Sequence, residues 1–370
     1  MVRPDVIVIG GGLHGCSIAL HLARRGIPVT VLEKDHVGRH ASGVNAGGVR
    51  RLGRHPAEIP LSVASMELWH SIVDLVDDDC GFECHGQVKV AENPAELEIL
   101  RERVTMVRSM GFTHEELVDQ AELRSLVPAI SDHCVGAIVC RADGAALPYR
   151  TTLAFRRKAE SLGVRFLEET RVTSVRRQGA MWQVESTSGR HEAPRLVNAA
   201  GAWAGNLAAM LGEPAPIEVM ALMLMISAPI ERFLHPVIGA TGRPLSFKQY
   251  RNGTVLVGGG YRGRPNVETN WTDLDFHGLA SSAQTVHDLF PVMRRAEIVR
   301  AWAGIEARMP DDIPVIGPSR TSENVWHAFG FCGHGFQMGP IVGSLVAELI
   351  ATGVTNLPIA PFDIGRFARA

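Results

Sequence analysis

Short runs of β-branched and aliphatic residues alternate with amphipathic stretches at the start of the chain. Val6–Ile9 and Val29–Leu32 are continuous apolar runs, and residues 16–25 between them have the apolar spacing of a helix that ends at Gly26. Strands buried on both faces of a parallel sheet are typically apolar throughout, whereas strands with one solvated face alternate. The pattern therefore predicts a strand, a helix and a second, parallel strand.

Two further amphipathic stretches and a group of strand-like runs follow. Residues 56–75 predict one helix, and residues 96–110 predict a second whose charged face we expect to lie in solvent. Later the pattern favours strands at 219–226, 245–251 and 254–258, with an Asn-Gly turn between the last two. The first of these is rich in methionine, and we expect a buried strand rather than a surface that faces a partner. These runs predict a second, sheet-containing unit.

Composition and charge exclude several classes of function. Apolar residues make up 46% of the 370 residues and the formal net charge is −2, so we expect no basic surface for nucleic acid or anionic membrane. No run reaches the roughly 18 apolar residues of a membrane span, and the N-terminal run is too short for a signal sequence. The six cysteines are scattered without metal-ligand spacing. They predict reduced thiols, no metal site and a soluble, cytoplasmic protein.

Three glycines after the first strand form a nucleotide-binding pattern. Gly10, Gly12 and Gly15 fit a tight turn, a close backbone approach to a pyrophosphate, and close packing of helix on strand. The helix start offers N–H groups and a positive dipole end to the phosphates. Glu33 ends the second strand, where a carboxylate accepts ribose hydroxyls and disfavours the 2′-phosphate of NADP. These residues predict binding of FAD or NAD.

A loop of small residues separates these two cofactors. Its sequence from Ser42 to Gly48, Ser-Gly-Val-Asn-Ala-Gly-Gly, resembles the loop that passes the flavin ring in the D-amino-acid-oxidase-like family of FAD-dependent oxidoreductases. Segments around Val172, at 196–203 and at 330–339 resemble the same family in the same order. A flexible surface loop is the alternative interpretation of residues 34–50 taken alone. An NAD-only dehydrogenase has no use for the C-terminal segments.

The resemblance covers residues 5–355 and implies a fold. It implies an α/β protein in which a Rossmann-like FAD-binding domain of the glutathione-reductase type is interleaved with an α+β substrate domain that contains a large mixed or antiparallel sheet. The FAD-binding domain would comprise residues 1–84, 140–212 and 308–370, and the substrate domain residues 85–139 and 213–307.

The resemblance also implies the cofactor and its contacts. No cysteine lies just before Asp311, where sarcosine-oxidase-like members attach their flavin, so we expect noncovalent FAD. The implied FAD contacts lie in the glycine turn, the loop and the later segments: Gly10, Gly12, Leu13, His14, Gly15, Glu33, Lys34, Ser42, Asn45, Ala46, Gly47, Gly48, Val172, Ala200, Gly201, Trp203, Gly333, His334, Gly335, Phe336 and Gln337.

Family members oxidise the Cα–N bond of amino acids by hydride transfer to flavin N5, a step that depends mainly on orientation. Arg50 occupies the place of a substrate-carboxylate ligand in sarcosine-oxidase-like members, and Arg51 would point the other way in an extended segment. A surface or phosphate-side role for Arg50 is the alternative. The implied catalytic residues are Arg50, Tyr250, Glu306, His334 and Gln337.

Two of these residues depart from the family pattern. Glu306 stands where glycine-oxidase-like members place a carboxylate-binding arginine. A buried carboxylate is costly unless paired, so we expect Glu306 to pair with Arg308, with another protein arginine, or with a cationic group of the substrate. Gln337 stands where sarcosine-oxidase-like members often have a basic residue, and it brings no charge. Both departures argue against a simple glycine-sized substrate.

The scarcity of lysine indicates whether oxygen is the electron acceptor. Only four of the 37 basic residues are lysine, and none lies after Lys248. Monomeric sarcosine-oxidase-like enzymes carry an oxygen-activating lysine on the strand that aligns with residues 254–257, so we expect weak direct use of oxygen. In length and motifs the chain resembles β-type catalytic subunits of opine oxidases, D-hydroxyproline or proline dehydrogenases and sarcosine oxidases. Such subunits pass electrons to companion chains with another flavin or an iron–sulfur cluster.

The leading hypothesis is thus an FAD-dependent dehydrogenase of a secondary amino acid, an opine or a D-imino acid. A self-sufficient amino-acid, sarcosine or glycine oxidase that forms hydrogen peroxide is the enzymatic alternative. A flavin-binding assembly subunit without activity is the non-enzymatic one.

Overall fold

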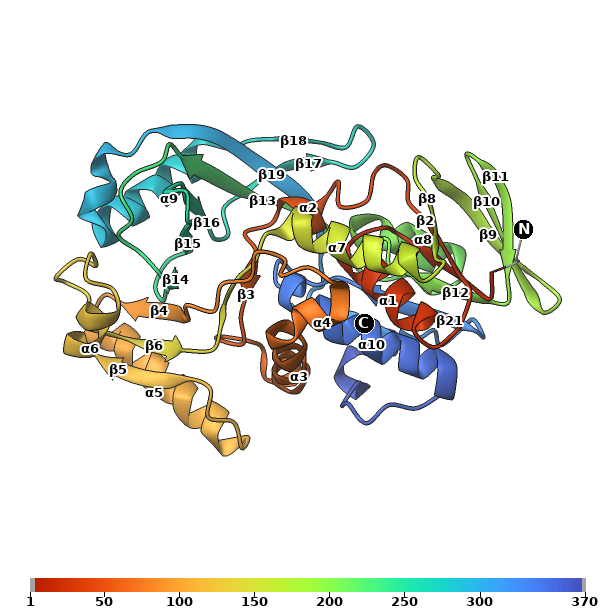
Figure 1. Cartoon of the computed structure of the whole chain (residues 1–370), viewed down its shortest axis with the longest axis horizontal. Coiled ribbons are helices and arrows are strands. Elements are labelled where there is room, and N and C mark those ends of the chain that lie inside the picture. The colour runs from red at the N-terminus through yellow and green to blue at the C-terminus, as the bar shows by residue number, and fades with distance from the viewer. Residues whose placement is uncertain (1–3, 368–370) are drawn as a thin grey trace.

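A computed structural model of the chain describes residues 4–367, and Figure 1 shows two lobes with the nucleotide-type sheet in one and a larger sheet in the other. The first sheet has six strands in the order β20-β21-β12-β1-β2-β8. They are β1 (Val6–Ile9), β2 (Val29–Leu32), β8 (Arg165–Leu167), β12 (Arg195–Asn198), β20 (Val315–Pro318) and β21 (Val325–Phe329). All neighbours pair in parallel except β20 with β21.

The apolar run of β1 is explained by burial on both faces of this sheet. Val6 and Val8 belong to the core cluster shared with the helices α1 (Leu13–Ala23), α7 (Pro148–Ser161) and α10 (Gly335–Thr352), whereas Ile7 and Ile9 belong to a cluster on the opposite face. That opposite face is covered by a three-stranded sheet of β9 (Val172–Gln178), β10 (Met181–Ser186) and β11 (Gly189–Ala193) and by α8 (Ala204–Met210). The predicted strand–helix–strand unit is confirmed.

Helix α10 is long and apolar enough to cross a membrane by length and composition, which the sequence pattern did not single out. In the fold, 78% of it is buried, and it packs between α1 and α3 (Ile59–His70). Its apolar surface is therefore part of the protein core.

The second sheet has ten strands, with β19 paired to β13 beside the main path β18-β17-β13-β16-β15-β14-β4-β6-β5. They are β4 (Gln87–Ala91), β5 (Glu116–Asp119), β6 (Gly136–Cys140), β13 (Glu218–Ser227), β14 (Val237–Ala240), β15 (Ser246–Gln249), β16 (Val255–Gly258), β17 (Arg262–Asn266), β18 (Trp271–Asp273) and β19 (Ile298–Arg308). Met220, Met223 and Met225 of β13 are buried, so the Met-rich strand is an interior one. The mixed and mostly antiparallel pairing confirms the expected fold class.

The remaining helices, strands and turns complete the fold. They are β3 (Gly48–Val49) paired with β7 (Gly144–Ala145), helices α2 (Ala41–Val44), α4 (Ile72–Val76), α5 (Pro94–Ser109), α6 (Gln120–Leu126) and α9 (Phe276–Leu289), and 3-10 turns at Pro56–Glu58, Gly201–Trp203, Pro291–Arg295, Ala360–Phe362 and Ile364–Phe367.

The single helix predicted over 56–75 is wrong in one respect. The backbone leaves the helical region at Ser71, which separates α3 from α4. The second predicted helix is confirmed as α5, which begins at Pro94 because the Asn93 side chain accepts the N–H of Glu96 as an N-cap. The domain boundaries stay predictions. Residues 1–3 and 368–370 of the predicted FAD-binding domain lie outside the described residues.

Candidate active site

A cavity of about 660 Å³ opens at the C-terminal ends of β1, β2 and β12. The glycine turn after β1 forms its floor, and backbone geometry explains two of the glycines. Gly10 has φ +112°, and a Cβ there would lie 2.3 Å from the Ala199 carbonyl oxygen. A Cβ on Gly15 would lie 1.9 Å from the Gly10 carbonyl oxygen, so its absence lets α1 approach β1 closely.

Gly12 also lines the cavity, but its backbone conformation does not require glycine. Its φ of −72° and ψ of 178° suit any residue. A Cβ there would lie 2.8 Å from Ser42 Oγ, which accepts a hydrogen bond from the Leu13 N–H at 2.9 Å. The first turn of α1 therefore meets the cavity through bare backbone, which fits a pyrophosphate at a helix N-terminus.

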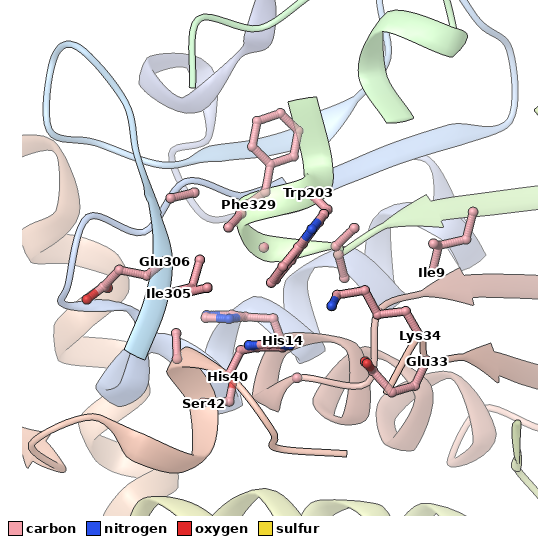
Figure 2. Close-up of a pocket in the computed structure, with 18 of the residues that line it drawn as sticks. Ile9, His14, Glu33, Lys34, His40, Ser42, Trp203, Ile305, Glu306 and Phe329 are labelled. Carbon is pink, nitrogen blue, oxygen red and sulfur yellow. The ribbon is translucent and has the colours of Figure 1, made fainter. Parts of the chain in front are cut away.

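Glu33 lies at the end of β2, and Figure 2 shows it beside Lys34 at one end of the cavity, with Glu306 at the other. The Glu33 carboxylate accepts N–H bonds from Gly11 at 2.6 Å and Asp35 at 2.9 Å, and burial raises its pKa. The Lys34 ammonium lies 3.8 Å from the Trp203 ring centre. An acid in this position fits the ribose end of a dinucleotide.

Most of the residues predicted to contact FAD surround this cavity: Gly10, Gly12, Leu13, His14, Glu33, Lys34, Ser42, Asn45, Val172, Ala200, Gly201, Trp203, Gly333, Gly335 and Phe336. Ala46, Gly47, Gly48 and His334 instead line a second cavity of about 460 Å³. Asn45, Glu306, Gly333 and Phe336 line both, so the two cavities adjoin. Gly15 and Gln337 line neither.

The family model of the DAO FAD-dependent oxidoreductases matches residues 5–349. The chain belongs to this family. FAD is its cofactor, and the bare glycine turn, the helix start and Glu33 around the larger cavity fit that molecule.

Individual relatives of this DAO-family chain match it almost end to end. Sarcosine oxidase subunit beta of Rhizobium meliloti (strain 1021) is 27% identical over 99% of this chain and 88% of that protein. The crystal structure of L-proline dehydrogenase from P. horikoshii is 29% identical, with a TM-score of 0.92 over 99% of this chain and 98% of that one. Mitochondrial dimethylglycine dehydrogenase of Rattus norvegicus is 25% identical, and the chain spans 45% of that longer relative.

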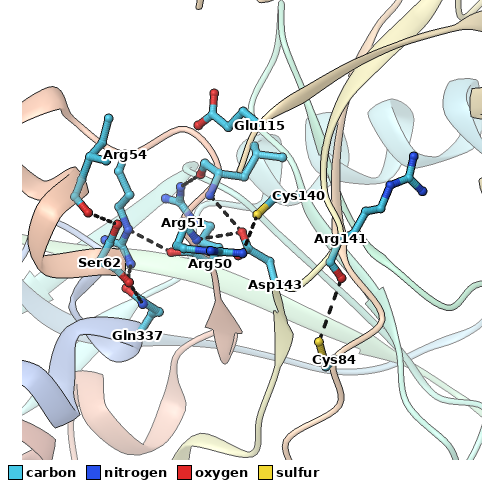
Figure 3. A network of polar contacts seen from close by, with 12 residues as sticks. Arg50, Arg51, Arg54, Ser62, Cys84, Glu115, Cys140, Arg141, Asp143 and Gln337 are labelled. Carbon is cyan, nitrogen blue, oxygen red and sulfur yellow. Dashed lines mark hydrogen bonds and ion pairs between the residues drawn. The ribbon is translucent and has the colours of Figure 1, made fainter. Parts of the chain in front are cut away.

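The second cavity lies between the FAD site and the large sheet of the DAO-family fold, and Arg50 lines it. The Arg50 guanidinium donates one hydrogen bond, to the Leu52 carbonyl at 2.7 Å, and forms no ion pair among the described residues. Arg51 points elsewhere, as predicted, and bonds Asp143 at 3.1 Å (Figure 3). Arg50 is thus a cation with donors left over beside the FAD site.

Arg54 is a site residue that sequence reasoning missed. Its buried guanidinium lines the second cavity and donates to the Arg50 carbonyl at 3.0 Å, the His334 carbonyl at 2.6 Å and Gln337 Oε1 at 3.0 Å (Figure 3). It ties the segment after β3 to the start of α10. The available signal was a third arginine four residues after Arg50.

The structure corrects the prediction for Gln337. Its side chain is 0% exposed, accepts from Arg54 and donates to the Ser62 carbonyl at 2.8 Å. The third residue of α10 faces α3 because the two helices pack together, so its amide faces away from the substrate side. Gln337 therefore holds Arg54 in place.

Two other predicted residues have different surroundings. His334 lines the second cavity, and its Nδ1 lies 3.2 Å from the carboxylate of Glu58, a fully buried residue that sequence reasoning missed. Tyr250 lines neither cavity. Its ring centre lies 4.7 Å from the Lys248 ammonium, and burial raises its pKa to about 12. The predicted catalytic contact of Tyr250 does not agree with this position.

Glu306 of β19 lines both cavities and is a half-buried carboxylate without an ion pair among the described residues. Arg308 is not its partner, because Arg308 bonds Asp312 at 2.6 Å and Glu218 at 2.9 Å. Burial raises the pKa of Glu306 to about 7, and the Gly333 N–H counteracts that shift only in part. Half of the carboxyl groups would be ionised near neutral pH.

Lys248 weakens the argument from the scarcity of lysine. Residues 254–257 carry no lysine, but the neighbouring strand β15 places Lys248 opposite Leu256. Its ammonium lies 3.0 Å from the point that a Cβ of Gly47 would occupy, and it has no hydrogen-bond partner among the described residues. A lysine therefore lies directly behind the predicted flavin loop. The expectation of weak oxygen use loses this support.

Lys248 should also lower the stability of the protein at neutral pH. It is 5% exposed, and burial lowers its pKa to about 7 from an unfolded value of about 10.4. The destabilisation is complete below pH 7 and disappears as the pH rises through the unfolded pKa. We expect Lys248→Met to raise the melting temperature at pH 6.5 by roughly 5 °C or more, with little gain at pH 10.5. An equal gain at both pH values would show that packing, not charge, is responsible; Lys158→Met is the control.

Proposed function

We propose that this DAO-family enzyme oxidises the Cα–N bond of a secondary amino acid, such as an opine, a D-imino acid or an N-alkyl amino acid. The observation that carries the proposal is a pair of ionisable side chains of opposite sign, Arg50 and Glu306, that line one cavity beside the FAD site and form no ion pair among the described residues. An amino acid presents one carboxylate and one basic nitrogen, which complement such a pair. The names of the three relatives, for sarcosine, dimethylglycine and L-proline, support N-substituted substrates.

In this proposal each residue has a separate task. Arg50 binds the α-carboxylate with the donors that Leu52 leaves free, and Arg54 fixes the backbone that carries it. Glu306 faces the basic nitrogen or a cationic arm of the substrate. Bound FAD supplies the two-electron acceptor for the Cα hydrogen. The protein contributes orientation and a cavity that excludes water.

An anaerobic screen tests this function. The FAD-loaded protein is mixed with opines, N-methyl amino acids, D-amino acids and primary L-amino acids, and the flavin absorbance near 450 nm is followed. We expect bleaching with at least one N-substituted amino acid and not with its N-acyl derivative, in which the nitrogen is no longer basic. Absence of bleaching across all amines would favour a flavin-binding subunit without activity.

We further propose that the chain is the catalytic subunit of a cytoplasmic hetero-oligomer whose companion chains carry a flavin or an iron–sulfur cluster. The name of the Rhizobium meliloti relative, a subunit beta, supports the assembly. The six unpaired cysteines support a reducing compartment. A self-sufficient oxidase is the second candidate, and the position of Lys248 behind Gly47 favours it. Slow re-oxidation of the bleached flavin in air would support the subunit, and rapid re-oxidation with hydrogen peroxide would support the oxidase.

Glu306→Gln should remove a pH-dependent preference for cationic substrates. With a pKa of about 7, the carboxyl is mostly neutral at pH 6 and ionised at pH 8. For a substrate with a cationic arm we expect the Kd of the wild type to fall about tenfold over this range, and the variant to lose about 10- to 30-fold in affinity at pH 8. The variant should show a flat pH profile.

The control for Glu306→Gln is Asp312→Asn, because Asp312 lines the same cavity but is already paired with Arg308. For a substrate of the same length with a neutral arm, either variant should lose less than threefold in affinity. An equal loss for cationic and neutral substrates would contradict a charge-pairing role of Glu306.

A further inference from the structure

The cavity beside the FAD site contains more cations than one substrate carboxylate requires. Three of its arginines are neutralised by protein carboxylates: Arg243 by Glu92 and Asp288, Arg262 by Glu218, and Arg308 by Glu218 and Asp312. Arg54 donates to two carbonyls and an amide. Two cations remain that have donors free and no ion pair among the described residues, Arg50 and Lys89. Among the described residues Lys89 has neither an ion pair nor a hydrogen bond, and it lines this cavity.

Strand β4 places Lys89 and a second polar residue on the cavity face. Side chains of a strand alternate between its two faces. Val88 and Val90 are buried in the core of the large sheet, and the alternate residues Gln87 and Lys89 line the cavity. Gly239 of β14 lies opposite Lys89 in the parallel pairing. A glycine at that position has no side chain to occupy the space beside the lysine.

Neither polar side chain has a hydrogen-bond partner within residues 4–367. Gln87 is 8% exposed, and its Oε1 has no hydrogen bond. Lys89 is half-buried; burial and the neighbouring charge of Arg50 lower its pKa. A partly desolvated ammonium beside another cation is unfavourable unless a bound anion compensates it. A side-chain amide can offer its N–H groups to the same anion, since its oxygen and nitrogen exchange places by a simple flip.

We infer that Lys89 and Gln87 bind a second carboxylate of the substrate, in addition to the α-carboxylate held by Arg50. The inference rests on the proposed function and narrows it to N-substituted amino acids with two acidic groups, such as N-(carboxyalkyl) amino acids. The two free cations and the one free acid of the cavity then each have a counterpart in the substrate. The alternative is that Arg50 and Lys89 share a single carboxylate.

Unreactive ether analogues separate these two arrangements. Diglycolate and carboxymethoxypropanoate carry two carboxylates on an ether oxygen, whereas methoxyacetate and ethoxyacetate carry one, and none has a C–N bond to oxidise. Binding to the FAD-loaded protein is measured by calorimetry. We expect at least one diacid to bind wild-type protein tenfold or more tightly than its monoacid counterpart. No such preference in either pair would overturn the inference.

Lys89→Met tests the residue itself, since methionine keeps the length of the stem and removes the charge. We expect the variant to lose the preference for the diacid while binding the monoacid within twofold of the wild type. Lys158→Met is the matched control, because Lys158 of α7 lies away from the cavity and pairs with Asp77. This variant should retain the preference for the diacid. An equal loss for diacid and monoacid would show a shared carboxylate, and no loss would show that Lys89 is not a ligand; either result overturns the inference.

Failure of the proposed function would appear differently. If iminodiacetate and N-(carboxyethyl) amino acids never bleach the flavin while the diacid preference and its loss in Lys89→Met persist, the anion site stands and the oxidation of secondary amino acids does not. If they bleach the flavin no faster than N-methyl amino acids and the diacids show no preference, the oxidation stands and the second anion site does not.

Discussion

Gly12→Val is expected to abolish FAD binding while the fold remains intact. Gly12 has backbone angles that valine adopts without strain, so the effect does not arise from conformation. Its missing side chain leaves the cavity open at the first turn of α1, where N–H groups and the helix dipole favour a phosphate. The branched carbons of valine would fill this space and reach Ser42 Oγ, which lies 2.8 Å from the Cβ position.

The measurement for Gly12→Val is the flavin-to-protein ratio of the purified variant, with the Kd for added FAD. We expect the affinity to fall by at least about 100-fold, because a pyrophosphate would lose contacts with several N–H groups at once. The circular dichroism spectrum of the apoprotein should match that of the wild type. Gly15→Ala is the contrast, since its Cβ would lie 1.9 Å from the Gly10 carbonyl oxygen and should disrupt the fold itself. A Gly12→Val protein that purifies with one FAD per chain would contradict the assignment.

Arg50→Ala is expected to raise the substrate Kd by about 30- to 1,000-fold, the range for loss of a partner from a desolvated charge pair. Within the part of the chain that the structure describes, the guanidinium bonds only the Leu52 carbonyl, so most of its donors are free for a carboxylate. FAD content should stay unchanged, because Arg50 does not line the larger cavity. The Kd is measured from anaerobic flavin reduction at several substrate concentrations.

The control for Arg50→Ala is Arg262→Ala. Arg262 lines the same cavity but is bonded to Glu218 at 2.8 Å, so its loss should change the Kd by less than about threefold. Arg50→Lys should recover part of the affinity, since it restores the charge without the planar pair of donors. Release of FAD from Arg50→Ala would mean that this arginine supports the cofactor site and not the substrate.

Local patterns were sufficient for the nucleotide-binding half of the protein. The run Val6–Ile9, the glycines at 10, 12 and 15, and Glu33 lie within one strand–helix–strand unit, so their spacing along the chain dictates their spacing in the fold. The same holds for the strand pair joined at Asn252 and Gly253, which the structure pairs antiparallel.

Local patterns could not predict contacts between segments that are far apart in the sequence. Gln337 was expected at the substrate because it follows the C-terminal glycine motif, but the packing of α10 on α3 turns its amide to Ser62 and Arg54. Lys248 was placed by the pairing of β15 with β16. Its position along the chain gives no sign that it lies behind Gly47.

The sequence by itself determined the cofactor class, the fold class and Arg50 as the leading candidate for the substrate carboxylate. The nucleotide site follows from short motifs whose geometry is local, and the choice of FAD, the fold class and Arg50 follow from the resemblance of those and later motifs to the family. Only the tertiary structure decided which charges in the second cavity are compensated, because the partners come from strands and helices far apart in the chain. Among residues 4–367, Arg308 is paired and Glu306 is not, and Lys89 faces the cavity without a partner, opposite Gly239 of the neighbouring strand β14. The balance of free charges that selects a substrate is therefore a property of the assembled sheet and not of any one segment.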